Sequence, residues 1–169
     1  LTTYYRGKDI PDLPGTNTFH SKELFHIYES TPGYTPLLIV ATEESRPVAR
    51  LLAAIRKTKK WLPSSLVKQC VVYGAGEFLD TSLPASKEKE EEIFGEMLEH
   101  LTQEASRTCI LIEFRNLDNS MFGYRFFRKN DFFPVNWLRV RNSLHSTQKA
   151  EDRFSPSRLR QIKKGLKNG

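Results

Sequence analysis

The alternation of apolar and polar positions divides the chain into short strands and amphipathic helices. Two apolar runs, Leu37–Ala41 and Val48–Ile55, are joined by the polar stretch Glu43–Pro47. A connection this short predicts antiparallel pairing and therefore a β-hairpin. A third strand is predicted at Gln69–Tyr73, and the glycines that follow it at Gly74–Gly76 are typical of a turn.

Two further segments carry apolar residues at helical spacing. Ser21 is placed to cap a short helix whose apolar side contains Leu24, Phe25 and Tyr28. Ser86 begins the longest predicted helix, and acidic residues fill its first turns, where they are favourable to the helix dipole. Its predicted buried face comprises Ile93, Phe94, Met97, Leu98, Leu101 and Ala105. The intervening stretch Phe78–Ala85 is predicted to be a loop.

The segment after the long helix predicts a strand, a helix and another strand. The apolar run Cys109–Ile112 is typical of a buried strand, and a polar loop follows at Arg115–Asn119. Residues at helical spacing then predict a short helix that Asn119 or Ser120 caps. Phe133–Val140 is predicted to form the last strand.

Charge and composition divide the chain into three parts. Residues 1–18 predict an extended lead-in, residues 19–145 a single α/β domain, and residues 146–169 a polar linker followed by a basic helix. The net charge is +6, but the segment from Arg139 onward contains nine basic and two acidic residues. The rest of the chain is therefore about neutral. The basic segment is either an RNA-binding or acid-binding tail, or a solvated helix that packs on a further domain.

Cysteine and histidine positions indicate no metal chemistry. Cys70 and Cys109 lie inside apolar runs, without the spacing of metal ligands, which predicts buried thiols and favours a reducing cytoplasm. The four histidines are scattered and are predicted to be packing or surface residues. No apolar run approaches the roughly 20 residues of a membrane span.

The order of predicted elements resembles the GNAT superfamily of acyltransferases. The sequence Phe127–Phe132 is similar to the FYxKxGF helix end and turn of that superfamily. More narrowly, Phe19-His20-Ser21 and Arg158–Gly165 resemble the first domain of the Fem family of peptidoglycan aminoacyltransferases. The resemblance implies an α/β fold with a GNAT-like mixed, mostly antiparallel central sheet flanked by helices.

The function that this resemblance implies is acyl transfer. A Fem-like half would bind a peptide-bearing cell-wall precursor, with aminoacyl-tRNA as the acyl donor and a second GNAT-like domain following Gly169. Two alternatives stay open: a stand-alone acetyl-CoA-dependent N-acetyltransferase, or a non-catalytic module whose basic tail binds RNA or an acidic partner.

The glycines after the third strand bear on whether acetyl-CoA is a cofactor. GNAT enzymes that bind it place Q/R-x-x-G-x-G/A directly before a helix, whose N-terminal amides hold the pyrophosphate. Here Gly74 and Gly76 precede Ser86 by about ten residues, and no Gln or Arg stands in register. A plain turn explains them better.

The resemblance also indicates where proton transfer would occur. Many GNAT enzymes have a tyrosine as general acid near this helix end, where this chain has Phe127. Tyr124, one turn earlier, is the substitute candidate. Glu113, at its strand end, is a candidate general base, and the alternative is a structural ion pair with Arg115.

Arginines mark the candidate substrate-binding positions. Arg115 and Asn116 follow a predicted parallel strand, which is where open α/β sheets bind ligands, and an arginine there suits a carboxylate or phosphate. Arg139 and Arg141 alternate with apolar residues on the last predicted strand and so share one face. That face either lines a cleft or meets solvent.

Overall fold

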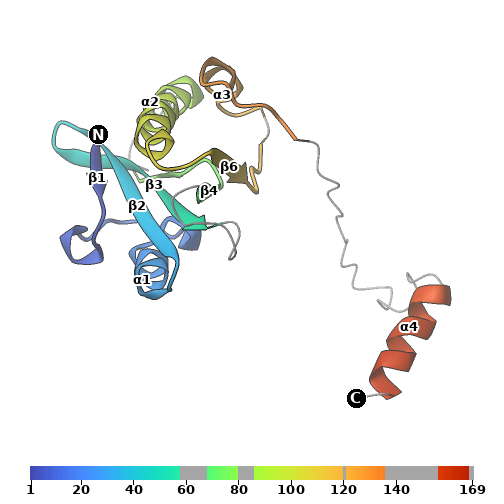
Figure 1. The fold of residues 1–169 in the computed structure, drawn as a ribbon. Coiled ribbons are helices and arrows are strands. Elements are labelled where there is room, and N and C mark those ends of the chain that lie inside the picture. The colour runs from blue at the N-terminus through green and yellow to red at the C-terminus, as the bar shows by residue number, and fades with distance from the viewer. Residues whose placement is uncertain (58–67, 80–85, 120, 136–155, 168–169) are drawn as a thin grey trace. The chain divides into compact units, whose positions relative to one another are not determined.

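The computed structural model forms two compact units, Leu1–Phe133 and Pro134–Gly169. It describes residues 1–57, 68–79, 86–119, 121–135 and 156–167 (Figure 1). The first unit holds the sheet, and the second is described through one helix, α4 (Pro156–Lys167). The linker predicted at residues 146–154 lies outside the described residues.

A six-stranded sheet organises the first unit. Its strand order is β1-β2-β3-β4-β6, and the short β5 pairs with β3. The strands are β1 (Thr2–Tyr4), β2 (Tyr34–Glu43), β3 (Arg46–Lys57), β4 (Lys68–Tyr73), β5 (Glu77–Phe78) and β6 (Leu111–Arg115). All pairings are antiparallel except the parallel pairing of β4 with β6. The predicted fold class, a mixed and mostly antiparallel sheet flanked by helices, is confirmed.

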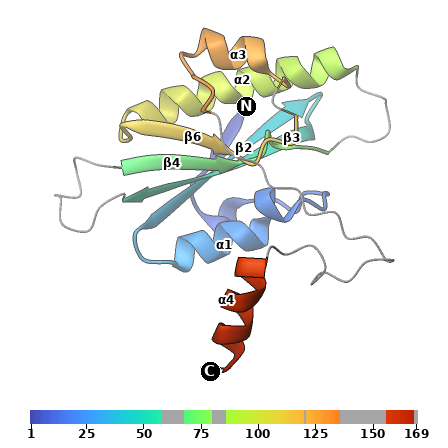
Figure 2. The same cartoon turned by 90° about the vertical axis from the view of Figure 1, so that its right-hand side faces the viewer.

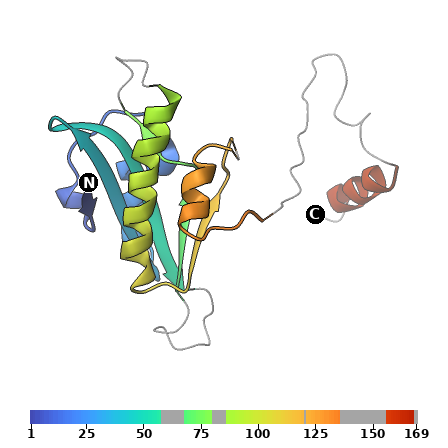
Figure 3. The ribbon, with the colours of Figure 1, turned by 90° about the horizontal axis from the view of Figure 1, so that it is seen from above.

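Helices cover both faces of this sheet. They are α1 (Lys22–Ser30), α2 (Lys87–Ser106) and α3 (Tyr124–Lys129), with 3-10 turns η1 (Gly7–Asp9) and η2 (Thr18–His20) near the N-terminus. Figure 2 shows α1 on one side of the sheet, and α2 and α3 on the other. Figure 3 shows α2 beside α3. A Cβ added at Gly95 of α2 would meet the ring of Phe126 of α3. Because both faces are covered, the central strands are apolar on both sides.

The β2–β3 hairpin is confirmed, with a two-residue turn. Glu44 and Ser45 both adopt positive φ, 46° and 68°, as the tight turns that match strand twist require. The predicted runs Leu37–Ala41 and Val48–Ile55 lie inside the two strands and pair with each other.

Both predicted serine caps are confirmed. Ser21 Oγ accepts a hydrogen bond from Leu24 N at 3.1 Å, and Ser86 Oγ accepts one from Lys89 N at 3.3 Å. These bonds satisfy amides that have no partner inside the helix. The predicted apolar face of α2 is buried against the sheet, with Ile93 partly buried.

Three predicted boundaries were wrong. The strand after α2 is Leu111–Arg115 instead of Cys109–Ile112, because Cys109 N still donates to Ala105 O at the end of α2, at 2.8 Å. Phe78 belongs to β5 because it pairs with Ala49. The predicted lead-in contributes β1, which pairs with the outer edge of β2.

The start of α3 also differs from its prediction. Gly123 precedes its first residue, Tyr124, whereas Asn119 Oδ1 accepts from Met121 N in the turn before it, at 3.0 Å. Ser120, the other predicted cap, lies outside the described residues. Of the predicted strand Phe133–Val140, residues 133–135 are irregular, and the others lie outside the described part of the chain.

Candidate functional site

The face of the sheet that α1 partly covers becomes polar toward β6. Strand alternation places the side chains of Cys70, Val72 and Phe114 against α2 and α3. The intervening residues of β3, β4 and β6 face the other way, and the strand register aligns them: Arg56 pairs with Gln69, and Tyr73 pairs with Arg115. We call the group on this side the polar sheet face: Arg56, Gln69, Tyr73, Glu113 and Arg115.

A carboxylate forms the centre of the polar sheet face. Glu113 Oε2 accepts hydrogen bonds from Gln69 Nε2 and from Arg115 Nη2, the latter at 2.8 Å. The side chains of Arg115 and Glu113 are 34% and 23% exposed, so ligands can reach both. The hydrogen bond from Arg115 lowers the pKa of Glu113 below its ordinary value, and the charge of Arg56 acts in the same direction.

Aromatic rings border this face on the side of α1. Phe19 stacks on Tyr73 with ring centroids 5.6 Å apart, and Tyr28 stacks on Tyr34 at 5.4 Å. Burial raises the pKa of Tyr28, which keeps its hydroxyl protonated, while the nearby charge of Arg56 opposes this shift. A ligand at the polar sheet face would therefore meet flat apolar surface beside charged groups.

The structure separates the two candidate catalytic residues. Tyr124 begins α3, which packs through Phe127 against Phe114, with ring centroids 5.0 Å apart. Glu113 neighbours Phe114 in β6 and so projects from the opposite face of the sheet. Glu113 is also held in an ion pair with Arg115, and its lowered pKa makes it a weak proton acceptor at neutral pH.

The four candidate substrate-binding residues have different positions. Arg115 is the last residue of β6, not a loop residue, since Gly74 N donates to its carbonyl at 2.7 Å and continues the ladder. Asn116 follows it with a φ of 54° and is exposed. Arg139 and Arg141 lie outside the described residues.

The start of α2 is poorly suited to a pyrophosphate. Gly74 and Gly76 lie in the turn that leads from β4 to β5. They are therefore not at the N-terminus of α2, which agrees with the turn predicted from the sequence. Ser86 already caps the helix, and Glu88 and Glu90 lie in its first turn. These carboxylates would repel a phosphate where the helix dipole would otherwise attract it.

Sequence reasoning missed a buried ion pair between Arg50 and Glu77. Their side chains are 5% and 11% exposed, and Arg50 Nε and Nη2 lie 2.7 and 2.6 Å from Glu77 Oε2. Glu77 Oε1 accepts from Thr16 N and Asn17 N. Burial alone would raise the pKa of Glu77, but these hydrogen bonds outweigh it and lower that pKa. The signal in the sequence was a single arginine inside the apolar run Val48–Ile55.

His20 is the buried histidine next to this ion pair, in line with the predicted packing role. Its Nδ1 accepts a hydrogen bond from Leu52 N at 3.1 Å, so the neutral ring carries its proton on Nε2. That Nε2 is buried beside Gly74, and a backbone hydrogen bond with Tyr73 opposes the lowering of the pKa of His20. Burial lowers the pKa of His20 to about 4, with Arg50 adding to the shift and Glu77 opposing it.

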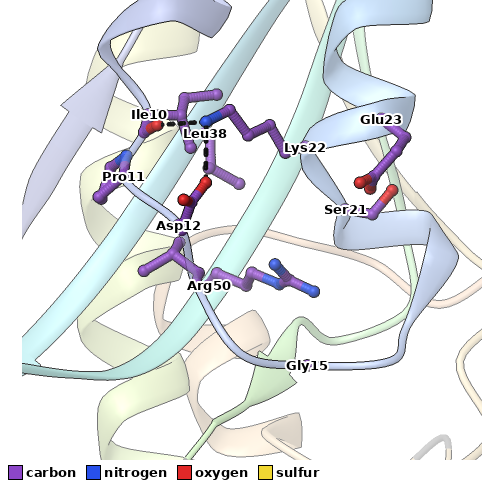
Figure 4. Close-up of a pocket in the computed structure, with 10 residues that line it drawn as sticks. Ile10, Pro11, Asp12, Gly15, Ser21, Lys22, Glu23, Leu38 and Arg50 are labelled. Atoms are coloured by element: carbon purple, nitrogen blue, oxygen red, sulfur yellow. Dashed lines mark hydrogen bonds and ion pairs between the residues drawn. The ribbon is translucent and has the colours of Figure 1, made fainter.

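A small cavity of about 140 Å³ lies between the lead-in and the start of α1 (Figure 4). Lys22 Nζ crosses it to donate to Ile10 O at 2.7 Å and pairs with Asp12 at 3.3 Å. Arg50, which also lines it, is engaged by Glu77. Because both of its cations, Lys22 and Arg50, are held in ion pairs, we consider this cavity part of the scaffold.

Two other features are absent from the described ranges. Within them, no group of three or more His, Cys, Asp or Glu side chains lies close enough to hold a metal ion. Nor does any helix there have the length and apolar character to cross a membrane.

Comparison with known proteins gives only distant structural similarity. No protein-family model and no curated protein matches the chain. Similar solved structures include a probable acetyltransferase (11% identity, TM-score 0.45, covering 75% of this chain and 78% of that chain). A second is a transcriptional regulator from Bacillus halodurans (14% identity, TM-score 0.47, covering 71% of this chain and 73% of that chain). A third is an aminoglycoside 6'-N-acetyltransferase from Acinetobacter haemolyticus (13% identity, TM-score 0.42, covering 73% of this chain and 79% of that chain). Values of this size assign the chain to no family.

Proposed function

We propose that this chain is an acyltransferase-type domain of GNAT-like fold that acts as a Fem-like half. In this proposal it binds a peptide-bearing cell-wall precursor, and aminoacyl-tRNA supplies the acyl group. A second GNAT-like domain would complete the chemistry. The supporting observation is the separation of Glu113 from Tyr124 by the sheet, while charged and polar side chains gather on the polar sheet face.

Acyl transfer to an amine needs one group that removes a proton from the nucleophile and one that protonates the leaving group. Both must reach the same reacting carbonyl. Glu113 lies in an ion pair, and Tyr124 lies on α3, across the sheet. This arrangement supports binding of the acceptor by the first unit, with proton transfer supplied from elsewhere.

The start of α2 favours this proposal over a stand-alone acetyl-CoA-dependent enzyme. Its cap is occupied by Ser86, and its first turn is acidic. An acetyl-CoA pyrophosphate would have to bind without that helix N-terminus.

Isothermal titration of the full chain tests the proposal. We expect saturable heat with a peptide-bearing nucleotide-sugar precursor, and no heat with acetyl-CoA. Arg115→Glu should weaken precursor binding by about tenfold or more, because a lost charge-assisted hydrogen bond typically costs this much. Arg46→Glu, at the hairpin end of β3, is the matched control. Saturable acetyl-CoA binding without precursor binding would identify the stand-alone N-acetyltransferase instead.

A further inference from the structure

Among the residues that the structure describes, the polar sheet face carries an unbalanced positive charge. Its charged members are the guanidinium groups of Arg56 and Arg115 and the carboxylate of Glu113. Glu113 is paired with Arg115, whereas Arg56 acts on Glu113 only through space. In the described part of the chain, the Nε atoms of both arginines are buried without a hydrogen-bond acceptor.

A partly buried excess charge is costly, because water solvates it incompletely. One further carboxylate would make the face electrically neutral. A phosphate dianion would leave it negative by one charge. A guanidinium also matches the two oxygens of a carboxylate in a planar, bidentate arrangement.

The surroundings of Arg56 suit the end of a peptide. Gln69, opposite Arg56 in the register of β3 and β4, supplies an amide that already donates to Glu113. The stacked pair Tyr28 and Tyr34 lies on the side of α1, and Tyr34 is opposite Arg56 in the register of β2 and β3. A carboxylate at Arg56 would thus have flat apolar surface beside it for a small side chain.

We propose that the polar sheet face is a carboxylate-binding site in which Arg56 holds the free C-terminal carboxylate of a peptide. Glu113 is the internal counter-ion that holds Arg115 in place and limits the site to one further negative charge. The inference rests on the proposed function, since it names the part of the acceptor that this face recognises.

The test compares N-acetyl-alanyl-alanine with its C-terminal amide, by titration calorimetry on the full chain. The acid should bind about tenfold more tightly than the amide, the ratio typical of one charge-assisted hydrogen bond. Arg56→Gln should abolish that ratio, Arg56→Lys should restore part of it, and Arg46→Gln should leave it unchanged. Acetate should compete with the acid, and inorganic phosphate at the same concentration should not.

Glu113→Gln gives a second test of the charge argument. The variant raises the charge of the face to two positive units, so it should bind the acid several-fold more tightly and accept phosphate. Equal affinity for acid and amide, or a ratio that survives Arg56→Gln, would overturn the inference.

The outcomes also separate this inference from the proposed function. Precursor binding that Arg56→Gln leaves intact would retain the function and reject the carboxylate site. Dipeptide binding without precursor binding would retain the site and reject the function.

Discussion

Protonation of His20 should destabilise the first unit well above the pH at which carboxylates titrate. In the fold, Nδ1 accepts the hydrogen bond from Leu52 N, and the ring is fully buried. If Nδ1 were protonated, its N–H would face the N–H of Leu52 with no acceptor between them. The ring would also carry a positive charge in the core, next to Arg50. The folded state therefore favours the neutral ring.

The magnitude follows from the pKa of His20. Burial lowers it from 6.5 to about 4. In the unfolded chain the ring takes up a proton below about pH 6.5, whereas in the folded chain it does so only near pH 4. Between these values the unfolded state binds more protons, so stability falls as the pH falls. At about 1.4 kcal/mol per pKa unit, the full loss is about 3 kcal/mol, of which about 2 kcal/mol occurs between pH 7 and pH 5.

Urea unfolding followed by circular dichroism, at pH 7, 6 and 5, measures this loss. The pKa values of Glu77 and Glu113 lie below their ordinary value of 4.5, so their stabilising effect is lost only at lower pH. His20→Asn is the control, because its Oδ1 can still accept from Leu52 N and it does not titrate. This variant should be less stable at pH 7 and should lose the dependence on pH from 7 to 5. The reasoning would be refuted if the free energy of unfolding of the wild type did not change between pH 7 and pH 5. It would also be refuted if the His20→Asn variant kept the wild-type dependence on pH.

Three further substitutions test other contacts by the same unfolding measurement. Glu77→Gln leaves Arg50 buried without its counter-ion and should cost about 3 kcal/mol; an effect under about 1 kcal/mol would contradict the burial of this pair. Gly95→Ala should destabilise α2 by about 1–3 kcal/mol, because the new Cβ would clash with the Phe126 ring. In a Phe126→Ala background the same change should be neutral or stabilising, since alanine favours helix. Ser86→Ala should cost about 1 kcal/mol through the lost cap, and no change would show that the cap is solvated instead.

Local patterns in the sequence determined most of the elements. The hairpin, the capped starts of α1 and α2, and the buried face of α2 followed from polar and apolar spacing alone. These features depend on neighbours within about one turn or one strand pair. The mixed sheet was predicted through the family resemblance that the order of the elements suggested. The boundary between α2 and β6, at Cys109, was predicted less well. There a helix end and a strand start compete for the same backbone groups.

The candidate site was decided by contacts between distant segments. The sequence named Arg115 and Glu113, and it left open whether they form an ion pair; their 2.8 Å contact answers that question. Arg56 joins them only because β3, β4 and β6 align in register, a pairing that no local pattern specifies.

The buried polar groups depended most on tertiary structure. Arg50 and Glu77 are 27 residues apart, and His20 and Leu52 are 32 apart. Each pair forms because closure of the core removes water from these groups, and a polar group without water must find a partner in the protein. The sequence thus determined most of the elements and the faces that they bury. Tertiary structure alone decided which polar side chains meet, because their pairing is a consequence of burial.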